Sequence, residues 1–105
     1  MTVAEEPVRL DLKGPVFQRQ LFGLPKDRQW AVLRTLRKLS GMSWNQVHRD
    51  GGLKWEQILS RSGPHGSKLY SLRVDQGFRA VACRDGSWLR ILSLHPDHDS
   101  AYSGR

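Results

Sequence analysis

Two short turn signals in the last third of the chain limit its possible folds most strongly. Asp75-Gln76-Gly77 and Asp85-Gly86 each separate two runs in which apolar and polar residues alternate. Alternation with a period of two is typical of half-buried strands, and Asp-Gly between two such runs is a strong hairpin signal. The runs 70–74, 78–83 and 88–94 are therefore predicted to form a three-stranded antiparallel meander.

A long amphipathic helix is predicted from Lys26 to Leu39. Pro25 stands where an N-terminal proline is tolerated, Asp27 suits the positive end of the helix dipole, and Gly41 is a stop signal. Its apolar residues recur at helical spacing and are expected in the core. The predicted core comprises Trp30, Leu33, Leu36, Leu39, Tyr70, Leu72, Val74, Ala80, Ile91 and Leu92.

Shorter signals complete the prediction. Alternating residues over 8–12 predict a strand that follows a loose tail over residues 1–7. Residues 17–24 predict a short helix, and Ser43-Trp44-Asn45-Gln46 has the form of a capping box that opens another. Gly51-Gly52 interrupts this last stretch, and helices are predicted over most of 17–59.

The predicted fold class is α+β, in one domain that spans residues 1–105. The N-terminal strand and the C-terminal meander are expected to form a small antiparallel sheet, with the helices packed on one side.

The charge balance favours polyanionic partners. Lys and Arg number 17 against 10 Asp and Glu, which gives a net charge of +7, and such a chain is suited to RNA, DNA or an acidic protein. The single cysteine, Cys83, excludes an internal disulfide and is expected to be a buried small hydrophobic residue. Neither a secretory signal nor a membrane span is apparent, so a soluble cytoplasmic protein is expected.

The strands carry a recurring arginine pattern. Leu72-Arg73 ends one predicted strand, a short turn follows, and Phe78-Arg79 opens the next; a polar segment after Leu94 is closed by Tyr102. This pattern resembles the RelE/ParE superfamily of toxins from type II toxin–antitoxin systems. With the preceding helices, the resemblance covers about residues 8–102 and implies a small curved sheet with helices on one side.

The resemblance implies two possible activities. Members that resemble RelE are ribosome-dependent endoribonucleases that cut mRNA in the decoding site, whereas ParE-like relatives poison DNA gyrase and have no nuclease site. We favour a metal-independent mRNA endoribonuclease that inhibits translation, contacts mRNA and rRNA on the ribosome, and is neutralised by an acidic antitoxin. A gyrase poison and a non-enzymatic nucleic-acid-binding module are the alternatives.

Cleavage of RNA by its own 2′-OH needs a base, a cation for the phosphate and an acid for the leaving oxygen. The resemblance places Arg79 at the phosphate-stabilising position and Tyr102 at the C-terminal tyrosine. His98 is the predicted general base or acid because imidazole titrates near physiological pH, and His95 is the other candidate. The side chains of Arg79 and His98 are expected to be exposed, so their replacement should not unfold the domain.

The chain departs from RelE itself, which uses lysines and an arginine for catalysis. Pro96 and Asp97 lie about where the last of these arginines would be, and Ser71 and Leu69 lie near the lysine positions with Lys68 displaced. In relatives that resemble HigB and YoeB, a C-terminal histidine takes part in catalysis. The mechanism therefore stays open between these two patterns.

Further cations are predicted to contact RNA, and no cofactor is predicted. His95-x-Asp97-His98 lacks the additional ligands that zinc needs, so no metal is expected, and Asp97 and Asp99 are expected to orient the histidines or to cap a turn. Trp44, Trp55 and Trp88 fit the core, base stacking or an antitoxin contact equally well. The predicted RNA-binding residues are Arg73, Lys68, Arg90, Arg34, Arg37 and Lys38.

Overall fold

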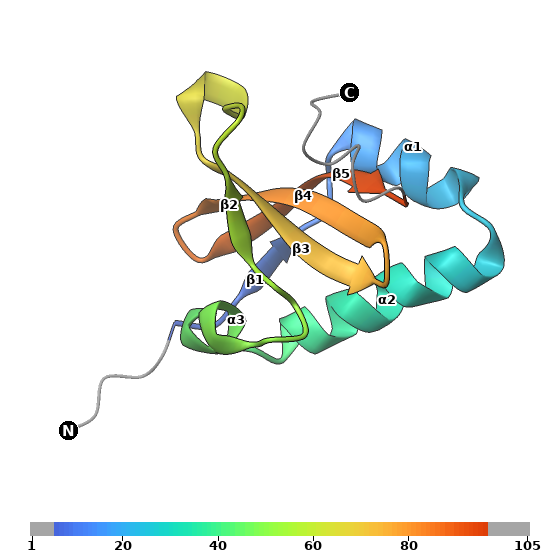
Figure 1. The fold of residues 1–105 in the computed structure, drawn as a ribbon, viewed down its shortest axis with the longest axis horizontal. Helices are drawn as coiled ribbons and strands as arrows, with labels where there is room; N and C mark the ends of the chain where they lie inside the picture. Colours follow the sequence, from blue (N-terminus) through green and yellow to red (C-terminus); the bar gives the residue numbers. More distant parts are fainter. Residues whose placement is uncertain (1–5, 97–105) are drawn as a thin grey trace.

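A computed structural model describes residues 6–96, which form one five-stranded sheet with helices against it (Figure 1). The spatial order of the strands is β1-β5-β4-β3-β2. The strands are β1 (Arg9–Asp11), β2 (Glu56–Ile58), β3 (Leu69–Asp75), β4 (Phe78–Asp85) and β5 (Trp88–His95). The helices are α1 (Pro15–Gly23), α2 (Lys26–Ser40), α3 (Trp44–Arg49) and the 3-10 turn η1 (Pro64–Gly66). The predicted α+β class is confirmed.

The C-terminal meander is confirmed as well. β3 pairs antiparallel with β4, and β4 pairs antiparallel with β5. Both tight turns use a glycine with positive φ, 71° at Gly77 and 60° at Gly86, a conformation that favours glycine. β1 joins the other side of β5 in parallel, so the sheet is mixed rather than wholly antiparallel.

The helices cover one face of the sheet, here called the helix face (Figure 1). The core lies between the helices and the sheet, where every second residue of each strand packs against the apolar sides of α1, α2 and α3. Its strand members are Leu72, Phe78, Ala80, Ala82, Leu89, Ile91 and Leu94. None of the helices within residues 6–96 is both long and apolar enough to span a bilayer.

The core prediction for α2 is wrong at two positions. Trp30 and Leu33 are 63% and 48% exposed, whereas Val32, Leu36 and Leu39 are buried. A helix turns about 100° per residue, so residues spaced by three drift by about 60° at each step and Trp30 ends about 180° from Leu39. A stripe at spacing three cannot stay on one face for four positions.

The remaining core predictions differ in how deeply they are buried. Leu72, Ala80 and Ile91 are fully buried, as predicted. Tyr70, Val74 and Leu92 are only half-buried, although each packs against other apolar or aromatic side chains.

The helical prediction beyond Gly52 is also wrong. Glu56–Ile58 forms the edge strand β2, which pairs antiparallel with β3. β3 would otherwise have an unpaired edge, and pairing of its backbone groups outweighs the weak local preference for helix.

The capping box of α3 is confirmed, since Gln46 N donates to Ser43 Oγ (3.2 Å) and Ser43 N donates to Gln46 Oε1 (2.8 Å).

The described part of the predicted N-terminal tail is held in place. Trp44 N donates to Glu6 O at 2.9 Å, and Pro7 forms an isolated bridge with Ser43. The Glu6 carboxylate also lies 3.1 Å from a guanidinium nitrogen of Arg84. Residues 6 and 7 are therefore fastened to α3 and β4, contrary to a loose tail.

β5 contains a one-residue bulge at Leu92. Val81 pairs with Ser93, whereas the next residue of β4, Ala82, pairs with Ile91. Because side chains alternate along a strand, the extra residue exchanges the two faces for the rest of β5. Leu94 consequently joins the core, and the following residue, His95, lies on the opposite face.

Candidate active site

The face of the sheet away from the helices, here called the open face, carries three polar side chains in one row. Arg73 of β3 pairs with Arg79 of β4, and Arg79 pairs with His95 of β5. Directly paired residues point to the same face with Cβ atoms roughly 5 Å apart. The structure thus brings three of the predicted site residues together, and we call them the Arg–Arg–His row.

Arg79 is buried in this row. Its residue is 6% exposed, and its Nη1 atom is inaccessible and has no hydrogen-bond partner within residues 6–96. The prediction of an exposed Arg79 is therefore wrong, because the open face also carries an apolar cluster of Ile58, Leu69 and Val81 beside it. A buried cationic nitrogen without a partner is costly and is suited to an incoming anion.

His95 is buried too, at 4% exposure, whereas the histidine that was expected to be exposed, His98, lies outside the described residues. Its Nε2 lies 2.7 Å from the hydroxyl of Ser93, two residues earlier on the same face. Burial lowers the pKa of His95, and the positive charge of Arg61 lowers it further. The imidazole is therefore neutral at pH 7 and equipped to accept a proton.

Two contributors to this site were missed from the sequence. Ser93 could have been found, because a residue two positions before His95 shares its face on a strand. Arg61 lies in the segment after β2, and no local pattern relates it to a histidine in β5.

Arg90 lies on the open face but at the other end of the sheet, where it is engaged by acids. Its Nε donates to Asp11 Oδ2 at 2.7 Å, and Asp85 lies 3.9 Å away. The hydrogen bond from Arg90 lowers the pKa of Asp11, which is 8% exposed. Within the described structure, Arg90 stabilises the junction of β1 and β5 rather than extending the row.

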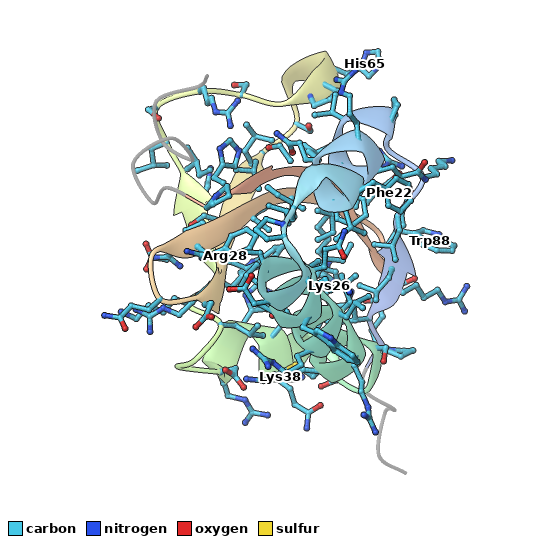
Figure 2. The ribbon with its side chains drawn as sticks, turned by 90° about the vertical axis from the view of Figure 1, so that its right-hand side faces the viewer. Phe22, Lys26, Arg28, Lys38, His65 and Trp88 are labelled. Atoms are coloured by element: carbon cyan, nitrogen blue, oxygen red, sulfur yellow. The ribbon has the colours of Figure 1, made fainter. Side chains whose placement is uncertain are left out.

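The predicted RNA-binding residues of α2 lie on the helix side of the molecule, because α2 covers that face of the sheet, and Figure 2 labels one of them, Lys38. Lys38 pairs with Asp50 at 3.0 Å, and Arg37 lies on the exposed side of α2. Arg34 and Lys38 nevertheless line a groove that Arg73 also borders, so this groove joins α2 to the row. The other predicted contact, Lys68, lies before β3 and is described further below.

Two predicted catalytic residues, His98 and Tyr102, lie outside the described residues, as do Asp97 and Asp99. Within residues 6–96, no group of three His, Cys, Asp or Glu side chains is placed to hold a metal ion. Cys83 is free and buried as predicted, and burial raises its pKa.

The three tryptophans for which the sequence left several roles open separate into two groups. Trp44 and Trp55 pack with the main core, whereas Trp88 is 45% exposed.

No family model matches the chain, and no curated protein matches it. One similar solved structure is a copper-bound mutant toxin from Helicobacter pylori, with 18% identity and a TM-score of 0.49. The match covers 89% of this chain and 97% of that chain. These values are too low to transfer the function of that toxin to this chain.

Proposed function

We propose that the chain is the toxin of a type II toxin–antitoxin module, similar to the RelE/ParE superfamily, and that it cleaves ribosome-bound mRNA without a metal. The observation that carries this proposal is the Arg–Arg–His row. An unpartnered guanidinium nitrogen and an imidazole whose pKa is lowered by burial lie on adjacent strands. They supply two of the three groups that phosphodiester cleavage by an internal 2′-OH needs, the base and the cation.

His95 is proposed as the general base. Its neutral imidazole takes the proton of the 2′-OH, whose oxygen then attacks the adjacent phosphorus. A 2′,3′-cyclic phosphate forms, and the bond from phosphorus to the 5′-oxygen breaks. The contact of Ser93 with Nε2 fixes the orientation of the ring.

Arg79 is proposed to stabilise the charge that develops on the phosphate. Its Nη1 can donate a charge-assisted hydrogen bond without first losing a protein partner. Loss of one such preorganised donor costs about 100- to 1,000-fold in rate. Arg73, half-buried at the next position of the row, supplies a second positive charge that holds the RNA backbone.

The leaving 5′-oxygen needs a proton from another group. A histidine kept neutral by its surroundings is a poor proton donor, so His95 does not fill both roles. His98 and Tyr102 remain the proposed acid and its assistant on the sequence resemblance alone.

The proposed partners follow from charge. A net charge of +7 favours both rRNA and an acidic antitoxin. Both associations should weaken as salt rises, because each depends on exposed cations such as those of α2.

The test is single-turnover cleavage of ribosome-bound mRNA in the presence of EDTA. Arg79→Ala and His95→Ala should each lower the cleavage rate at least about 100-fold. The matched control is Arg9→Ala, which removes an exposed arginine of β1 and should leave the rate unchanged.

Full activity of Arg79→Ala would refute the role of the row. A parallel assay of DNA breakage by gyrase distinguishes the alternative: breakage together with intact mRNA would identify a gyrase poison. Normal growth and translation on overexpression would contradict the toxin assignment as a whole.

A further inference from the structure

A second cationic surface lies on the helix face, at the opposite end of β3 and β4 from the Arg–Arg–His row. Tyr70 pairs with Ala82, so continuing this register places Lys68 opposite Arg84 on the same face. These side chains border a hollow of about 420 Å³, here called the β3–β4 hollow. Its lining comprises Glu6, Ser67, Lys68, Tyr70, Arg84 and Gly86.

The aromatic ring in this hollow is held in a fixed orientation. Tyr70 stacks on Trp55, with ring centroids 4.7 Å apart and ring planes 14° apart. Trp55 in turn meets Trp44 edge to face, with centroids 5.5 Å apart. A ring that is ordered before binding loses little entropy when a planar ligand stacks beside it.

The two cationic side chains at the hollow differ in how firmly they are held. Arg84 lies with its Cζ 4.0 Å from the ring centroid of Trp44, is paired with Glu6, and donates from Nε to Gly86 O at 2.8 Å. Lys68 is exposed and has no ion-pair partner within residues 6–96. One cation is thus fixed while the other is free to reach a ligand.

We propose that the β3–β4 hollow binds one nucleotide of single-stranded RNA, with its base stacked on Tyr70 and its phosphate held by Lys68 and Arg84. An aromatic platform flanked by cations is the arrangement that binds single strands. The lining contains no aliphatic side chain, which disfavours the apolar side of a protein helix. The choice of RNA over other polyanions rests on the proposed function.

This site lies on the other face of the sheet from the row. It therefore contacts nucleotides away from the scissile phosphate and contributes affinity rather than chemistry. Its loss should weaken RNA binding while leaving the rate of cleavage of bound RNA unchanged.

The experiment measures binding of a fluorescein-labelled single-stranded RNA dodecamer by anisotropy, at several salt concentrations and without ribosomes. Tyr70→Ala should weaken binding by about 5- to 150-fold, the range for loss of one stacked base. Tyr70→Phe keeps the ring and should bind as the unaltered protein does. Lys68→Ala should reduce the salt slope by about 0.7, the value for one phosphate contact on a single strand.

Arg9→Ala is the control for the loss of one positive charge. At low salt, its affinity for the RNA should be closer to that of the unaltered protein than the affinity of Lys68→Ala is. Since Tyr70 also packs against Trp55, each variant is first checked by circular dichroism and thermal unfolding. If Tyr70→Ala does not fold, the proposal is tested with Lys68→Ala and with a duplex RNA of the same sequence. Because a duplex offers no unpaired base to stack on Tyr70, its affinity should not depend on the hollow.

Unchanged binding by folded Tyr70→Ala would overturn the proposal, as would an unchanged salt slope for Lys68→Ala. Normal RNA binding combined with loss of a copurifying acidic protein would also overturn it and identify a protein site instead. Failure of the nuclease proposal is recognised separately, since the unaltered protein would then leave ribosome-bound mRNA intact whatever the hollow binds.

Discussion

Replacement of Arg79 by methionine should separate function from stability. The substitution keeps a long, flexible side chain and removes the charge and the hydrogen-bond donors of Arg79, while Arg73 and His95 stay in the row. Because Nη1 is buried without a partner, the unaltered protein bears the desolvation penalty of that group with no compensating bond within residues 6–96.

The magnitude follows from this missing bond. A buried unsatisfied donor costs about 1–3 kcal/mol, so Arg79→Met should raise the free energy of unfolding by an amount in this range. For a domain of this size, each kcal/mol raises the midpoint of thermal unfolding by about 4–8 °C. Cleavage of ribosome-bound mRNA should fall by about 100- to 1,000-fold in the same variant.

The matched control is Arg90→Met, because Arg90 lies on the same open face. Its Nε donates to the buried carboxylate of Asp11, which the substitution would leave without its cation. This variant should unfold at lower temperature and retain cleavage activity. The two changes therefore have opposite signs in thermal unfolding, and only Arg79→Met should lower the cleavage rate. A less stable Arg79→Met protein that still cleaves mRNA would refute the assignment and make Arg79 a structural residue.

Three further outcomes test the fold and the site. Burial lowers the pKa of His95 below its unfolded value of about 6.5, so the unfolded state binds more protons than the folded state does. The free energy of unfolding should therefore fall as pH drops below about 6.5, and His95→Gln should remove this dependence in thermal unfolding between about pH 5 and 8. The hydrogen bond from Arg90 lowers the pKa of Asp11, so the ionised carboxylate of Asp11 stabilises the fold fully above its ordinary pKa. This contribution is lost as pH falls through the lowered pKa, and Asp11→Asn should make the free energy of unfolding less dependent on pH in acid. Ser43→Ala removes the cap of α3 and should cost about 1 kcal/mol in urea unfolding, whereas an unchanged midpoint would mean that α3 does not need its cap.

Turns and caps whose geometry depends on a few neighbouring residues could be predicted from the sequence. The hairpins follow from turn residues such as Gly77 and Gly86, whose positive φ values favour glycine, and α3 begins where Ser43 and Gln46 exchange hydrogen bonds. β2 could not be predicted in this way, because it forms to pair with β3 rather than from its own three residues.

The site shows the same division. The sequence identified Arg73, Arg79 and His95, but their alignment in one row depends on the register of three strands. The burial of Arg79 and the influence of Arg61 on His95 arise from packing across the open face, which involves residues distant in the chain. Tertiary contacts of this kind leave no periodic signal in a sequence.

The bulge at Leu92 makes the row tolerant of a change in the length of β5. In a regular strand of the same residues, His95 would face the helices, because the extra residue is what reverses the alternation. Deleting the codon for Leu92 removes that extra residue and leaves Ser93, Leu94 and His95 on their present faces, with His95 still opposite Arg79. A chain that is one residue shorter at this point therefore keeps the row, and a three-nucleotide deletion there does not by itself identify a silenced copy.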